Sequence, residues 1–155
     1  MENRSNNPEA SAACILRLPK PEDYEKMAEL AGQLGYPCTA DQIRVRLDAM
    51  QGSSEHVVYV AALSDGQVAG WIGAFVFRSV ELSQRTEISG LVVDQKFRSL
   101  GIGKHLVAAV EQWSRSHGCD AISVHCNVTR SDAHRFYRKN DYERVKTQEL
   151  FHKHL

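Results

Sequence analysis

The sequence lacks an excess of charge of either sign, because Lys and Arg number 19 and Asp and Glu also number 19. A general nucleic-acid-binding protein is usually basic. The balance therefore argues against nucleic acid as a partner, although it leaves room for a local basic patch. Hydrophobic residues at 43% and charged residues at 25% are ordinary values for one globular chain of 155 residues.

Long apolar runs are also missing. No stretch approaches the roughly 18 consecutive apolar residues of a membrane-spanning helix, so we expect no membrane partner. The opening segment, MENRSNNPEASAA, is polar and has no apolar core of a secretory signal. We therefore predict a disordered tail over residues 1–12, a single domain over residues 13–155, and a cytoplasmic location.

Cysteine is sparse and has no functional pattern. Cys14, Cys38, Cys119 and Cys126 have neither metal-site nor disulfide-framework spacing, and the histidines are scattered. We expect free thiols in a reducing compartment and no metal. The chain also has no internal repeat and no low-complexity segment.

The most informative stretch is EISGLVVDQKFRSLGIGKHLVA, residues 87–108. A short apolar run predicts a strand, a basic turn follows, and apolar residues at helical spacing predict a helix. The first turn of a helix has N–H groups without partners and a partial positive charge. Gly101 and Gly103 let an anion approach that backbone, and Arg98 and Lys104 add positive charge. The stretch therefore predicts a pyrophosphate site.

Two common phosphate-binding loops do not fit this stretch. A Walker A loop needs Gly where Arg98 stands and a hydroxyl residue where His105 stands. A dinucleotide-binding fingerprint needs a third Gly where Leu106 stands. An ordinary strand-to-helix turn with two glycines is the plain alternative, and the basic loop favours the anion site over it.

The rest of the pattern predicts a mixed sheet. A strand–helix–strand unit requires a parallel pair, whereas hairpin-linked strands are antiparallel. The fold class is therefore α/β (α+β), with a mostly antiparallel sheet. The predicted strands are 14–18, 56–63, 68–77, 86–93, 121–126 and one or two within 142–155. The predicted helices begin at residue 21, at residue 39, after residue 101 and at residue 130. Thr39 and Gln42 are predicted to form a capping box at the second of these helices.

The Arg98-x-x-Gly101-x-Gly103 turn after an apolar strand resembles motif A of the GNAT superfamily of acyl-CoA N-acyltransferases. The segment from Ala133 to Tyr142 is similar to the family's A-x-x-F-Y-x-x-x-G-F/Y segment, and the order of elements also agrees. The resemblance implies six to seven strands, a central parallel pair splayed for CoA, and helices on both faces.

The sequence departs from the family pattern at two positions. Asp141 stands where the family usually has Gly, but Asp tolerates left-handed backbone better than most residues, so the turn can survive. Arg130 stands where many members carry an Asn. Any Asn contact to the cofactor would then have to come from Asn127, three residues earlier.

The resemblance implies acetyl-CoA as co-substrate and no metal. The pantetheine arm would pair with free backbone of the motif A strand, like an added strand, and the pyrophosphate would bind backbone amides of the turn. The residues assigned in this way are Leu91, Val92 and Val93 for the arm, Arg98, Ser99, Leu100, Gly101, Ile102, Gly103 and Lys104 for the pyrophosphate, and Asn127 and Tyr137 as further contacts.

The chemistry requires a base and an acid. A protonated alkyl amine cannot attack a thioester, so a base must remove a proton, directly or through water. Glu87 is the candidate base by its place in the motif A strand, and His125 is the alternative. Tyr137 matches the family's proton-donating Tyr, and its plain alternative is a packing residue on a short helix.

The implied function is transfer of an acetyl group from acetyl-CoA to a primary amine of a small molecule or peptide, by direct attack in a ternary complex. The alternatives are a non-catalytic acetyl-CoA sensor and a phosphate-binding domain unrelated to CoA. The acceptor cleft would involve residues 34–39, the 78–85 loop and the C-terminal strands, with Tyr36 and Glu81 as candidate contacts. An exposed edge near Leu150 would suit a homodimer.

Overall fold

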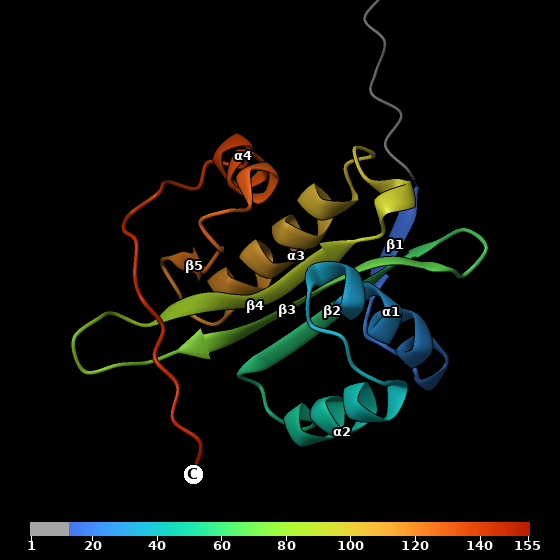
Figure 1. The fold of residues 1–155 in the computed structure, drawn as a ribbon, viewed down its shortest axis with the longest axis horizontal. Helices are drawn as coiled ribbons and strands as arrows, with labels where there is room; N and C mark the ends of the chain where they lie inside the picture. Colours follow the sequence, from blue (N-terminus) through green and yellow to red (C-terminus); the bar gives the residue numbers. More distant parts are fainter. Residues whose placement is uncertain (1–12) are drawn as a thin grey trace, which may run out of the picture. The chain divides into compact units, whose positions relative to one another are not determined.

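The computed structural model describes residues 13–155, so the tail predicted over residues 1–12 lies outside it. The described residues divide into two compact units, 13–124 and 125–155. The first unit contains the sheet and three of the α-helices, and the second contains one helix (Figure 1).

The first unit is built on a five-stranded sheet in the order β1-β2-β3-β4-β5. The first four strands pair antiparallel, and β4 and β5 pair parallel. The sheet is therefore mixed, as the sequence predicts. The strands are β1 (Cys14–Arg17), β2 (His56–Leu63), β3 (Val68–Phe77), β4 (Arg85–Val93) and β5 (Ile122–Val124).

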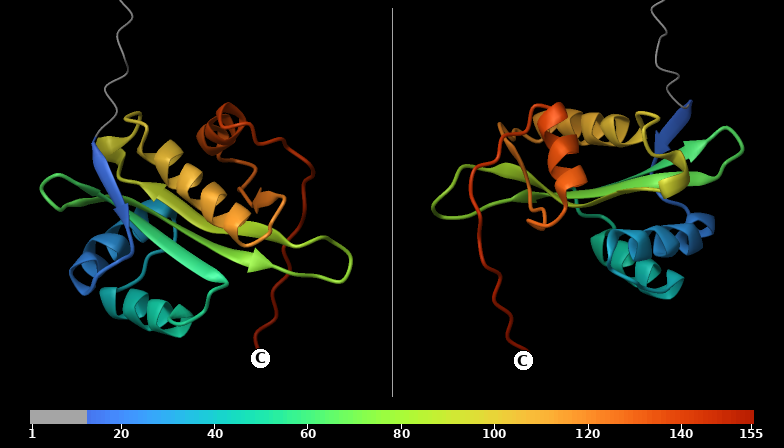
Figure 2. Two further views of the ribbon diagram at one scale, coloured as in Figure 1. Left: turned by 180° about the vertical axis from the view of Figure 1, so that it is seen from behind. Right: turned by 45° about the horizontal axis from the view of Figure 1, so that its top comes forward.

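Helices cover both faces of this sheet. α1 (Tyr24–Leu34) and α2 (Ala40–Met50) lie on one face, and α3 (Ile102–Ser116) lies on the other (Figure 2). On the α1 face, a cluster of buried side chains from α1, α2 and the sheet forms a hydrophobic core, which includes Met27, Leu30, Val60 and Val92. No described helix is long and apolar enough to cross a membrane.

Local sequence signals account for most of these elements. The predicted capping box at the start of α2 is confirmed: Gln42 N–H donates to Thr39 Oγ1 at 3.2 Å, and Thr39 N–H donates to Gln42 Oε1 at 3.0 Å. The β2–β3 hairpin turns at Gly66, whose φ of 86° is in the region that favours glycine. Both strands of that hairpin have the predicted bounds.

The second unit contains α4 (Ser131–Lys139). Asp141 follows this helix with a φ of 64°, so the residue does take the left-handed conformation that the family's Gly would take. Beyond it, residues 142–155 contain no strand. The prediction of one or two strands there was wrong.

Two further features of the predicted sheet need correction. The described residues form five strands, not six to seven, because the segment after Asp141 has no strand neighbour and leaves Leu150 and Phe151 exposed. The parallel pair lies at the edge of the sheet and not at its centre, because β5 is the last strand in the order. A strand needs a neighbouring ladder as well as a suitable sequence.

Candidate functional site

The turn between β4 and α3 has the backbone geometry of an anion site. Ser99 and Gly101 both have positive φ values, 66° and 80°. Gly101 is the N-cap of α3 and supplies no side-chain cap, and the helical bonding begins with His105 N–H donating to the Gly101 carbonyl at 3.1 Å. The N–H groups of residues 102–104 therefore precede the first helical bond, at the positive end of the helix dipole. This arrangement fits a pyrophosphate.

The side chains predicted at the phosphate site differ in their contacts and in their exposure. Arg98 turns back, and its Nε donates to the Val93 carbonyl at 3.2 Å, so it closes the turn onto the end of β4. Lys104 is exposed on the first turn of α3. Ile102 is 1% exposed and belongs to the core. Arg98 and Lys104 are therefore both exposed at the turn, whereas Ile102 has only its backbone to offer a ligand.

Strand β4 is paired on both sides for only part of its length. The parallel ladder with β5 covers Thr86 to Ile88, and β5 ends at Val124. From Ser89 to Val93 the strand pairs with β3 alone among the described strands. This half strand includes the predicted pantetheine segment, and its free edge fits an extended ligand that bonds to backbone. The Val92 side chain is buried in the core, so only its backbone is available.

A β-bulge marks the point where this pairing changes. Gly73 on β3 is opposite Gly90, and Ala74 is opposite Ile88, so Ser89 is the extra residue of β4. Space around the bulge is tight: a Cβ on Gly90 would lie 3.0 Å from the Trp71 ring, which would have to shift, and a Cβ on Gly73 would lie 2.9 Å from Ser89 Oγ, whose side chain would have to turn away. Sequence reasoning missed the bulge, because it depends on the register between two strands.

A pocket of about 820 Å³ opens on the same face of the sheet as α1 and α2. Most of its lining is apolar, and its polar members are few. Tyr36, a predicted acceptor contact, lines it and is 72% exposed, whereas Glu81 does not line it. The lining residues come from α1 and the segment after it (Met27, Ala31, Leu34, Gly35, Tyr36, Pro37), from α2 (Ile43, Arg46, Leu47, Met50) and from the sheet (His56, Val57, Val58, Trp71, Gly73, Ala74, Phe75, Ser89).

Glu87 lies beside this pocket. The adjacent Thr86 points to the other face of the sheet, where its Oγ1 accepts a 2.6 Å hydrogen bond from Ser114 of α3. Because side chains alternate along a strand, Glu87 faces the α1 and α2 side. Its direct cross-strand neighbour is Phe75, which lines the pocket. The candidate base is half-buried and sits two residues before the bulge.

The other predicted catalytic and cofactor residues belong to the second unit. Tyr137 packs edge-on against Phe136 at 5.2 Å and Tyr142 at 5.4 Å between ring centroids. Burial, reinforced by Cys126 and Tyr142 and opposed by Arg130, raises the pKa of Tyr137 above its ordinary value. The phenol therefore stays protonated at neutral pH, as a proton donor must.

Asn127 has a local structural role in this unit. Its Oδ1 accepts from Thr129 N–H at 3.0 Å and from Thr129 Oγ1 at 2.8 Å, which forms a turn before α4. Its carbonyl oxygen accepts from Arg130 N–H at 3.0 Å. His125, the alternative base, is exposed at the start of the unit.

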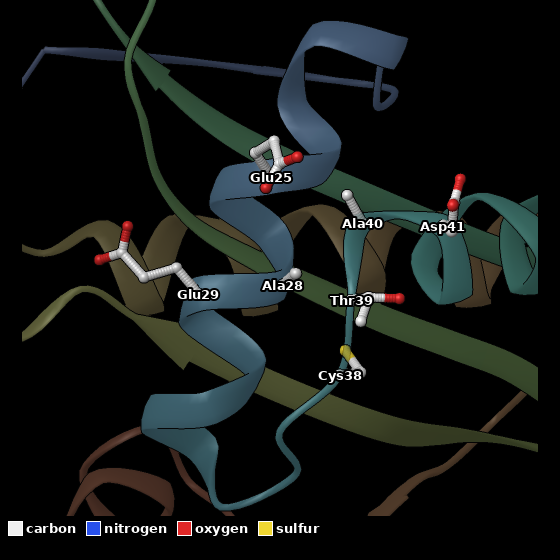
Figure 3. Close-up of a pocket in the computed structure, with 7 residues that line it drawn as sticks. All are labelled: Glu25, Ala28, Glu29, Cys38, Thr39, Ala40 and Asp41. Carbon is white, nitrogen blue, oxygen red and sulfur yellow. The ribbon is translucent and has the colours of Figure 1, made fainter.

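A second pocket, of about 510 Å³, lies between α1 and the start of α2 (Figure 3). Three carboxylates line it, those of Glu25, Glu29 and Asp41. No residue of β4 or of the glycine turn lines it, so it is separate from the candidate site. In the part of the chain that the structure describes, no group of three or more His, Cys, Asp or Glu side chains is arranged to hold a metal ion.

The geometry described above is consistent with a comparison of the whole chain with protein families. Residues 24–142 match the model of the acetyltransferase (GNAT) family. The chain belongs to the GNAT family. It is an acyltransferase.

Relatives of this GNAT protein with assigned activities acetylate amines. The chain is 32% identical over 136 residues to the aminoalkylphosphonate N-acetyltransferase of Salmonella typhimurium, covering 84% of this chain and 85% of that enzyme. It is 26% identical over 137 residues to an aminoglycoside N(6')-acetyltransferase type 1 of Stenotrophomonas maltophilia, covering 86% and 88%. The fold matches that of AAC(6')-Iy, solved with a CoA bisubstrate analogue, with a TM-score of 0.78, 18% identity, and coverage of 92% and 99%.

Proposed function

We propose that the protein transfers an acetyl group from acetyl-CoA to the primary amine of a small molecule, by direct attack in a ternary complex. The observation that carries this proposal is the position of Ser89. This residue lines the pocket and also begins the half of β4 that has no β5 neighbour. An acceptor in the pocket and an extended arm along β4 would therefore meet at the bulge.

Acetyl-CoA fits the groups that this chain offers. The N–H groups at the start of α3 would hold the pyrophosphate, with charge from Lys104, and the backbone of Leu91 to Val93 would hold the pantetheine arm. When bound, acetyl-CoA supplies the activated thioester. The CoA-bound state of a structural neighbour supports the same choice of co-substrate.

Two residues are proposed for the proton transfers, Glu87 and Tyr137. Glu87 would take the proton from the ammonium group, because it faces the pocket side of the sheet next to Phe75. Tyr137 would give a proton to the departing thiolate, because it occupies the position of the family's proton-donating Tyr and is protonated at neutral pH. Backbone N–H groups near the bulge and the end of β4 would polarise the thioester carbonyl.

Thermal-shift measurements with acetyl-CoA, CoA and ATP test the cofactor. We expect acetyl-CoA and CoA to raise the melting temperature and ATP to have little effect. Stabilisation by ATP alone would point to a phosphate-binding domain unrelated to CoA. The release of free thiol in the presence of a panel of primary amines then tests turnover. Binding of acetyl-CoA without thiol release from any amine would favour a sensor.

A further inference from the structure

The inward face of α2 carries a cation in the middle of an apolar stripe. Ile43, Arg46, Leu47 and Met50 recur at helical spacing, and all four line the pocket. Such a stripe normally consists of apolar residues, because it faces a core or a closed surface. Arg46 interrupts it where its guanidinium can reach the pocket.

The described part of the chain does not pair this guanidinium. Among residues 13–155, no hydrogen bond or ion pair involves the Arg46 side chain. Arg44, two residues earlier, provides the contrast, because it lies 3.6 Å from Asp41 and 3.3 Å from Asp48 on the outer face of the helix. Both arginines are exposed, but only Arg44, which does not line the pocket, is paired with carboxylates.

The pocket wall that residues 13–124 supply contains no carboxylate. Besides Arg46, the lining side chain that can carry a positive charge is that of His56. Its ring stacks on Phe75 with centroids 6.0 Å apart, and its Nδ1 lies 3.0 Å from Ser53 Oγ. The three carboxylates near α1 line the separate second pocket. Glu87 beside the pocket can meet one amine, but a polycationic acceptor would find no carboxylate for its further charges among the lining residues.

We propose that Arg46 selects the acceptor: the substrate is a primary amine with a short apolar body and an anionic group, a phosphonate, phosphate or carboxylate, at its far end. The planar guanidinium suits such groups, because it donates two parallel hydrogen bonds to their oxygens. This inference rests on the proposed acetyl transfer and assigns the substrate class of the same site.

The geometry orients such a molecule. Arg46 is on α2, whereas Ser89 and the Phe75–Glu87 pair are on the sheet across the pocket. The anionic group would bind at the helix, the apolar body would contact Leu47 and Met50, and the amine would face the bulge. Specificity and proton transfer then depend on opposite ends of the acceptor.

Three amines with the same three-carbon spacer isolate the effect of the group at the end of the acceptor opposite to the reacting amine. They are 3-aminopropylphosphonate, butylamine and 1,3-diaminopropane, assayed by thiol release with saturating acetyl-CoA. We expect kcat/KM to be highest for the phosphonate, by about tenfold or more over butylamine, and lowest for the diamine. Equal values for the three amines, or a preference for the diamine, would overturn the inference.

The variants Arg46→Met and Arg44→Met form a matched pair on the same helix. Arg46→Met should lower kcat/KM for 3-aminopropylphosphonate by about tenfold to a hundredfold, mainly through KM, and leave butylamine within about twofold. Arg44→Met should change neither. An unchanged phosphonate preference in Arg46→Met would remove Arg46 from recognition.

Direct binding separates this inference from the proposed function. Calorimetric titration of 3-aminopropylphosphonate into the CoA complex should show binding to the wild type and to Arg44→Met, and a loss of at least about tenfold in Arg46→Met. Arg46-dependent binding without thiol release from any amine would uphold the anion site and reject the acetyl transfer. Turnover of butylamine without any Arg46-dependent phosphonate binding would do the reverse.

Discussion

Lys26 Nζ lies 2.7 Å from Asp94 Oδ2, and the pair joins α1 to the first residue after β4. Asp94 is 1% exposed, and its Oδ1 also accepts from Lys96 N–H at 3.0 Å. The helix α1, which lines the 820 Å³ pocket, is thus tied to the start of the glycine turn. The pair fixes the distance between the two halves of the proposed site within the first unit.

This ion pair predicts a pH-dependent stability. Burial opposes ionisation of Asp94, but hydrogen bonds from Lys26 and the Lys96 N–H, with the charge of Lys26, outweigh it and hold the pKa of Asp94 below its ordinary value. A lowered pKa stabilises the fold above the unfolded-state pKa of about 3.9, and that contribution is lost as the pH falls through the folded-state pKa. Lys26→Met should therefore cost about 3 kcal/mol at pH 7 and much less near pH 2. Urea unfolding of both proteins across this range measures it, and an equal cost at both pH values would contradict it.

The positive φ of Gly101 predicts a specific effect on CoA binding. Gly101→Ala should cost about 1 kcal/mol of stability through backbone strain, and should weaken CoA about tenfold or more because the N–H groups at the start of α3 move. Gly66→Ala is the control, since Gly66 has a φ of 86° in the β2–β3 turn. It should show the same loss of stability with normal CoA affinity by calorimetry. Equal CoA affinity in the two variants would argue against the phosphate role of the α3 turn.

The identity of the base can be determined from pH–rate profiles. If Glu87 removes the proton, Glu87→Gln should lose the acidic limb of kcat/KM and fall by about a hundredfold or more at neutral pH, while His125→Ala keeps that limb. The opposite pattern would assign the role to His125. Retention of the limb in both variants would point to water-mediated proton loss without either side chain.

Tyr137 should matter mainly for the departure of the thiol. Tyr137→Phe keeps the ring contacts with Phe136 and Tyr142 but removes the phenol, so kcat should fall by about tenfold or more while CoA still binds. Tyr142→Phe is the matched control in the same aromatic cluster and should retain kcat. Normal kcat in Tyr137→Phe would exclude the phenol from the reaction.

Much of the fold was predictable because its signals are local. Asp65 and Gly66 set the hairpin, Thr39 and Gln42 set the start of α2, and the glycines near 101 set the turn into α3. Each of these depends on residues within a few positions of one another. The order of strands and the mixed sheet followed from the same signals.

The C-terminal segment shows where local signals fail. One or two strands were predicted within residues 142–155, but strand formation depends on a partner ladder, and Val145, Leu150 and Phe151 are exposed without one among the described residues. Ile122–Val124 is likewise shorter than its apolar sequence suggests, because only three residues of β4 pair with it.

The candidate site combines both kinds of information. The candidate anion site at residues 98–104 could be predicted from the sequence, because consecutive residues supply both the glycine spacing and the start of the helix. The pocket could not, because Arg46, Phe75 and Ser89 come from three elements and meet only through strand register and helix packing. The sequence by itself determined the glycine-bearing turn into α3, where we propose that an anion binds. Only the tertiary structure decided which side chains face the pocket, because the side a residue faces depends on the bulge at Ser89 and on the face of α2 turned to the sheet.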